Sequence, residues 1–75
     1  MFSDDFYIDT LGRQAAAVDR ALLEHKQDLV DGADADESAK VLAFETGAYV
    51  EMMQRATPVQ LIVHAAERAR SFHRQ

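Results

Sequence analysis

The side chains best suited to acid–base or metal chemistry at neutral pH are three histidines, His25, His64 and His73. A metal-binding pair on a helix needs two ligands three or four residues apart, whereas His64 and His73 are nine residues apart. Glu67 follows His64 by three residues, and we interpret these two as a polar pair on the helix surface. Because cysteine is absent and no four ligands cluster, we predict no metal site.

Covalent catalysis needs a nucleophile beside a base that activates it, and the sequence does not provide this arrangement. Ser71 lies two residues before His73, a spacing that points the two side chains apart on a helix. The glycines are isolated, so no glycine-rich phosphate-binding loop is indicated. We therefore expect a protein that is not an enzyme and that uses no cofactor.

An apolar stripe runs through the first part of the chain at alternating intervals of three and four residues. Its members are Ile8, Leu11, Ala15, Val18, Leu22, His25 and Leu29. This heptad spacing predicts one long helix over about residues 5–30 that packs against other helices. His25 has two interpretations: a core-boundary histidine with a hydrogen-bonded polar edge, or a group whose protonation destabilises the packing at mildly acidic pH.

Small residues interrupt this stripe, since Gly12 is followed by three alanines at positions 15–17. We expect another helix to cross closely there. The acidic residues 31–37 predict a loop, with Gly32 suited to the position that follows a helix. The aspartates of this loop do not have the spacing of a calcium-binding loop.

A second helix is predicted over about residues 37–56, and its apolar residues spread over an arc wide enough to contact two neighbours. Thr57, Pro58 and Gln60 then have the spacing of a capping box with proline at the first helical position. A third helix follows over about residues 58–73. The fold prediction is thus a single all-α domain, residues 1–75, with three helices.

A chain of 75 residues without cysteine has few means of stabilising itself except association with another chain. We therefore predict a homodimeric helical bundle. The residues expected to mediate self-association are Leu11, Ala15, Val18 and Leu22, with Tyr49 and Met52 facing them.

The formal charge of −5 is distributed unevenly, with −7 on residues 1–37 and +2 on residues 38–75. An acidic chain is poorly suited to general nucleic-acid binding but can be steered towards a basic protein surface. The sequence contains no apolar run long enough to cross a membrane, and its first residues lack the features of a signal peptide. We expect a cytoplasmic protein.

These observations favour a small acidic regulator, adaptor or chaperone-like protein that binds another protein through an apolar helical face. Aromatic residues near the N-terminus are the expected anchors and neighbouring acids the steering charges: Phe2, Phe6 and Tyr7, with Asp4, Asp5 and Asp9. Two alternatives stay open. One is a helix-turn-helix DNA-binding regulator that presents Gln60, His64, Arg68 and Arg70 to a groove, and the other is a structural subunit that only self-assembles.

Overall fold

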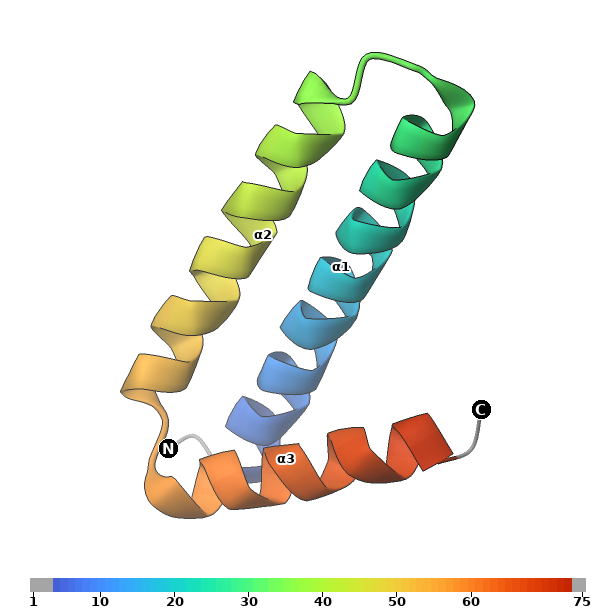
Figure 1. Ribbon diagram of the computed structural model, residues 1–75. Helices are drawn as coiled ribbons and strands as arrows, with labels where there is room; N and C mark the ends of the chain where they lie inside the picture. The colour runs from blue at the N-terminus through green and yellow to red at the C-terminus, as the bar shows by residue number, and fades with distance from the viewer. Residues whose placement is uncertain (1–3, 74–75) are drawn as a thin grey trace.

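The computed structural model describes residues 4–73, and these form three α-helices without any strand. Helix α1 spans Asp4–Asp31, α2 spans Asp36–Arg55 and α3 spans Pro58–His73. Helices α1 and α2 lie side by side as an antiparallel hairpin, and α3 crosses the hairpin at the end where α1 begins (Figure 1). The prediction of an all-α fold with three helices is confirmed for this part of the chain, while the homodimer stays a prediction.

Side-chain hydrogen bonds at three levels hold the hairpin together. Tyr7 Oη donates to the Met52 carbonyl (2.6 Å), Gln14 Nε2 donates to the Glu45 carbonyl (2.9 Å), and His25 Nδ1 shares a hydrogen bond with Ser38 Oγ (3.0 Å). Two of these α1 residues, Tyr7 and Gln14, lie one position before members of the predicted stripe. The face of α1 that meets α2 is therefore rotated slightly from the face that the sequence suggests.

The predicted stripe of α1 is covered along only half of its length. Ile8 and Ala15 are 5% and 1% exposed, and they lie between Asp4 and Asp19, the two α1 residues that bond to α3. Leu22 and Leu29 continue the same stripe at intervals of seven residues, yet they are 39% and 60% exposed. In the far half of this stripe His25 reaches Ser38 of α2, whereas Leu22 and Leu29 stay partly open to solvent.

The ends of the hairpin are fixed by local chemistry. Gly32 adopts a φ of 72°, the left-handed conformation that glycine tolerates best, and ends α1 in a Schellman motif. In this motif the Gly32 N–H donates to the Leu29 carbonyl (3.4 Å) and the Ala33 N–H to the Asp28 carbonyl (3.0 Å). Asp34 Oδ1 then accepts the Asp36 N–H (3.0 Å), so α2 begins after a short connection over residues 32–35.

The start of α3 has the predicted capping box. Gln60 N–H donates to Thr57 Oγ1 (3.2 Å), and Thr57 N–H donates in return to Gln60 Oε1 (2.8 Å). Gln60 Nε2 also donates to Asp4 Oδ1 (3.0 Å), which ties the first turn of α3 to the first turn of α1. This contact places α3 across the beginning of α1.

The molecule is flat, with principal extents of 45 × 27 × 16 Å. Its radius of gyration is 14.3 Å, whereas a compact domain of this length has about 11 Å. Few apolar side chains are fully buried within the described residues: Ile8, Leu11, Ala15 and Ala21. A chain of average apolar content thus leaves much of its apolar surface in contact with solvent.

Candidate functional site

A tyrosine–histidine pair lies where α3 packs against the hairpin. His64, on the inner face of α3, is only 3% exposed. Its Nε2 atom shares a hydrogen bond of 2.5 Å with the hydroxyl of Tyr49 on α2. The two rings meet edge to face, with centroids 5.7 Å apart and planes at 77°. The pair therefore joins α2 to α3 through both packing and a polar contact.

Burial keeps the His64 imidazole neutral. Desolvation is the main cause that lowers its pKa from 6.5, the nearby Arg68 guanidinium lowers it further, and Glu67 acts in the opposite direction. Nδ1 of the ring has no hydrogen-bond partner among the described residues. The expectation of a surface pair with Glu67 is wrong for His64, because the crossing of α3 over the hairpin buries this ring.

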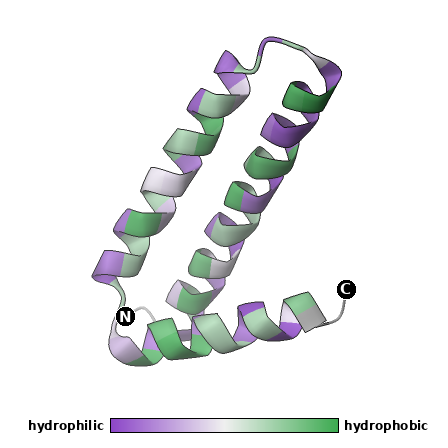
Figure 2. Cartoon of the chain, viewed as in Figure 1, coloured by the Kyte–Doolittle hydropathy of each residue, from purple (hydrophilic) through white to green (hydrophobic). Residues whose placement is uncertain are grey.

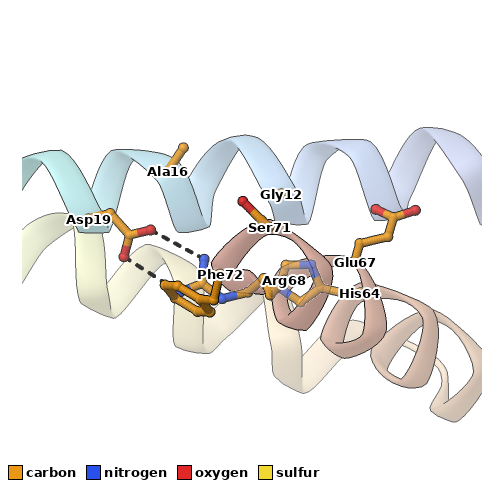
Figure 3. A pocket seen from close by; sticks show the side chains of 8 residues that line it. All are labelled: Gly12, Ala16, Asp19, His64, Glu67, Arg68, Ser71 and Phe72. Atoms are coloured by element: carbon orange, nitrogen blue, oxygen red, sulfur yellow. Dashed lines mark hydrogen bonds and ion pairs between the residues drawn. The ribbon is translucent and has the colours of Figure 1, made fainter. Parts of the chain in front are cut away.

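A hollow of about 230 Å³ lies between α1 and α3 beside His64 (Figure 3). Its lining residues are Gly12, Ala16, Asp19, His64, Glu67, Arg68, Ser71 and Phe72. A methyl group added at Gly12 would meet no atom within 4 Å, so the small residues of α1 open a space here. Within positions 12–17, where a close helix crossing was expected, Ala15 is buried, while Gly12 and Ala16 line the hollow.

One side of this hollow is closed by Arg68. Its guanidinium makes two hydrogen bonds of 3.5 Å to the carboxylate of Asp19 on α1, drawn as dashed lines in Figure 3. The guanidinium carbon also lies 5.2 Å from the centre of the Phe72 ring, a cation–π distance. Arg68 therefore connects the second half of α3 to the middle of α1.

A second and more apolar hollow, of about 540 Å³, opens between α2 and α3. Tyr49 and Met53 form its α2 side, and Leu61, Ala65, Ala69 and Phe72 form much of its α3 side. His64 and Arg68 line this hollow as well as the first one. Helix α3 is thus packed tightly only along its inner edge, with open space on both sides of the contact.

The contacts that the structure shows for His64 are a hydrogen bond and ring packing. Ser71 lines the first hollow, but the hydrogen-bond partner of His64 in the described part of the chain is Tyr49. Residues 4–73 contain no group of three histidine or acidic side chains placed to hold a metal ion. The buried ring stabilises the position of α3, and the surrounding surfaces are available for contacts with other molecules.

The predicted partner-binding residues have different environments. Phe2 lies outside the described residues, and Phe6 is exposed on the first turns of α1. The Tyr7 hydroxyl is instead used within the hairpin, in its bond to Met52. Among the three acids, Asp4 binds Gln60, Asp9 forms an ion pair with Arg13 (3.0 Å), and Asp5 is exposed.

The predicted self-association residues are mostly used within one chain. Leu11 and Ala15 are buried under the other two helices, and Val18, Tyr49 and Met52 are half-buried. Leu22 is the one of the six that is classed as exposed. Most of the surface predicted for self-association is therefore used within one chain.

Several large apolar side chains that the structure leaves exposed on the helices were not selected from the sequence. They include Leu23 and Val30 on α1, Val41 and Phe44 on α2, and Val59 and Ile62 on α3. The wide apolar arc of α2 was a usable signal, because it indicated two neighbours. In the structure α2 packs mainly against α1, so part of that arc stays uncovered.

The helix-turn-helix alternative depends on α3 presenting a polar face outwards. Gln60 and His64 instead lie on the inner face and are buried, while Arg68 is held by Asp19. Arg70 is the exposed member of this set. The side chains that would read a DNA groove are therefore largely used in packing α3 onto the hairpin.

Comparison of the chain with known protein families, with curated proteins and with solved structures finds no match. Within the part of the chain described here, none of the helices combines the length and the apolar character that crossing a membrane requires.

Proposed function

We propose that this protein is a non-enzymatic interaction module that binds another protein through the apolar face of α2 turned away from α3. The observation that carries this proposal is the exposure of Phe44, at 73%, beside exposed Val41 on the same face. Aromatic side chains, phenylalanine among them, are enriched in protein interfaces relative to the rest of the surface. Exposed Phe44, with Val41 beside it, is therefore the anchor that we assign to this face.

Helix geometry separates this face from the rest of the fold. Phe44 lies nine residues before Met53, which is two and a half helical turns, so the two side chains point in opposite directions. Met53 lines the hollow beneath α3. The Val41–Phe44 face consequently lies on the far side of the hairpin from α3, and a partner can bind it without disturbing the contact between α3 and the hairpin.

The charges around this face indicate the chemistry of the partner. Glu37 and Glu51 lie one heptad before and one heptad after Phe44, on the same stripe of α2. They pair with Lys40 (3.8 Å) and Arg55 (2.7 Å), but the first half of the chain adds a large excess of acid. The partner we propose presents an apolar groove with a basic rim, as a regulator with a nucleic-acid-binding surface would.

The test is capture of a partner from the native host by the tagged chain, compared with Phe44→Ala. The matched control is Leu23→Ala, which truncates a similarly exposed side chain on α1. Circular dichroism verifies that both variants keep their helices. The captured protein is then purified and titrated against the chain at increasing salt.

We expect Phe44→Ala to lose the partner and Leu23→Ala to retain it, with affinity that decreases as salt is raised. A partner that binds Phe44→Ala as well as the unaltered chain would overturn the placement of the site. Binding that is insensitive to salt would overturn the proposal that the partner's groove has a basic rim. The anchors predicted from the sequence are tested in the same assay with Phe6→Ala, because the Phe6 side chain is exposed near the start of α1.

A further inference from the structure

The face of the hairpin that carries α3 is only half covered, and this half-covered face is separate from the Val41–Phe44 face. Helix α1 is about 42 Å long, whereas α3, at about 24 Å, crosses it instead of running along it. Ile8 and Ala15 lie beneath α3, and Leu22 and Leu29 continue their stripe beyond it into solvent. We name Leu22 and Leu29 the open half of α1.

Helix α3 has an outer apolar stripe that complements this open half. Val59, Ile62, Ala66 and Ala69 follow one another at intervals of three and four residues, and all four are exposed. Ile62 lies two residues from both Gln60 and His64, so it is on the opposite side of α3 from the buried face. Figure 2 shows much of the first half of α3 in green, the colour of hydrophobic residues.

We propose that a second copy of this chain covers this side of the molecule, with the outer stripe of α3 from each copy packed on the open half of α1 of the other. The two faces meet about a two-fold axis that lies in the plane between them and runs perpendicular to the helices of the hairpin. Each α3 then lies between its own hairpin and that of its twin. Because every copy carries one open half and one outer stripe, a single symmetric contact covers both.

The amount of exposed surface agrees with this arrangement. The chain has 5705 Å² of accessible surface, whereas a compact monomer of 8.4 kDa has about 4600 Å². The excess of about 1100 Å² is close to the roughly 800 Å² that each partner buries in a stable interface of standard size. One two-fold contact therefore removes the excess, and a further layer of helices is not required.

The charges of the two surfaces also complement each other. Residues 24–37, which include the open end of α1, contain six acids and one lysine. Helix α3, which would cover the twin's open half, has Arg68 and Arg70 against Glu67. Because Arg68 is paired with Asp19 of its own chain, Arg70 is the exposed cation that faces the twin. Opposite charges on the two surfaces favour this pairing over contact between two acidic ends.

Light scattering over a dilution series of the full chain is the first test, and we expect twice the 8.4 kDa mass of one chain. Ile62→Glu and Leu29→Glu replace exposed side chains of a single chain, so each should keep its helical content. Each should raise the dimer dissociation constant about a hundredfold, because the substituted residue occurs in both symmetric contacts and weakens each about tenfold. Phe44→Glu, on the far face, is the matched control and should remain dimeric.

Disulfide trapping tests the register, since the chain has no cysteine of its own. Ile62→Cys chains mixed with Leu29→Cys chains should cross-link on oxidation, and Ile62→Cys alone should not. Cross-linking of Ile62→Cys alone would replace the proposed register with contact between two α3 helices. A monomer at every concentration would overturn the proposal and leave the function proposed for the Val41–Phe44 face standing. A dimer weakened by Phe44→Glu and unaffected by Ile62→Glu would also overturn it, and would assign the Val41–Phe44 face to the contact between two copies.

Discussion

Lowering the pH from 7.5 to 5.0 should destabilise the fold through His64. Burial and the Arg68 guanidinium hold the pKa of this ring below 6.5 in the folded chain, in spite of Glu67. Tyr49 on α2 bonds to the ring, and Asp19 on α1 neutralises part of the effect of Arg68. In the unfolded chain the imidazole is in water and titrates near pH 6.5.

The sign and the size of the effect follow from the number of protons bound. Below pH 6.5 the unfolded chain binds more protons than the folded chain, so stability falls as the pH decreases towards the folded pKa. One proton limits the slope to about 1.4 kcal/mol per pH unit. From pH 6.5 to 5.0 the loss is at most about 2 kcal/mol, against a total of about 4–11 kcal/mol for a chain of this length.

Urea unfolding followed by circular dichroism measures this loss, at a fixed chain concentration because association would add its own term. His64→Gln keeps a hydrogen-bonding group near Tyr49 but cannot titrate, so its stability should change much less between pH 6.5 and 5.0. His25→Gln, at a half-buried position bonded to Ser38, should keep the full pH dependence. If His64→Gln retained the pH dependence and His25→Gln lost it, the pH-sensitive histidine would be the one on α1.

Four other substitutions test how the helices are built, each by urea unfolding. Leu11→Ala removes a fully buried side chain and should cost about 2–5 kcal/mol, so a loss under about 1 kcal/mol would contradict its place in the core. Gly12→Ala should stabilise α1 by up to about 1 kcal/mol, because its added methyl group meets open space, whereas Gly32→Ala should destabilise by a similar amount at its positive φ. Thr57→Ala should cost about 1 kcal/mol by removing the hydroxyl that accepts the Gln60 N–H, and no change would exclude that cap as a stabilising contact.

The parts of the fold that could be read from the sequence are those with local causes. Thr57 and Gln60 satisfy each other's backbone across three residues, and Gly32 has the conformation that glycine favours after a helix. Both features depend on neighbours within one turn of the chain. The helices and their ends are therefore predictable, although α2 begins after Ala35 because Asp34 accepts the first free N–H from outside the helix.

The His64–Tyr49 pair could not be found in this way. His64 and Tyr49 are fifteen residues apart in sequence, and nothing in either position indicates that the rings meet. Their contact follows from the angle at which α3 crosses the hairpin. The hydrogen bond between Gln60 and Asp4, which are 56 residues apart in sequence, helps to set that angle. His64 and Glu67 were expected on the helix surface, because the sequence does not specify which face of a helix a distant segment will cover.

The stripe of α1 shows how far such reasoning extends. Its heptad spacing predicted that the whole stripe would be buried, and the chemistry of Leu22 and Leu29 is no different from that of Ile8. What differs is their place along α1, since α3 bonds to α1 at Asp4 and at Asp19, and Leu22 and Leu29 lie beyond Asp19. Periodicity predicts that an apolar stripe packs against another surface. Which surface covers it depends on the lengths of the other helices and on the angles at which they cross. The exposure of Leu29 in a single chain is thus the physical reason to look for a second copy.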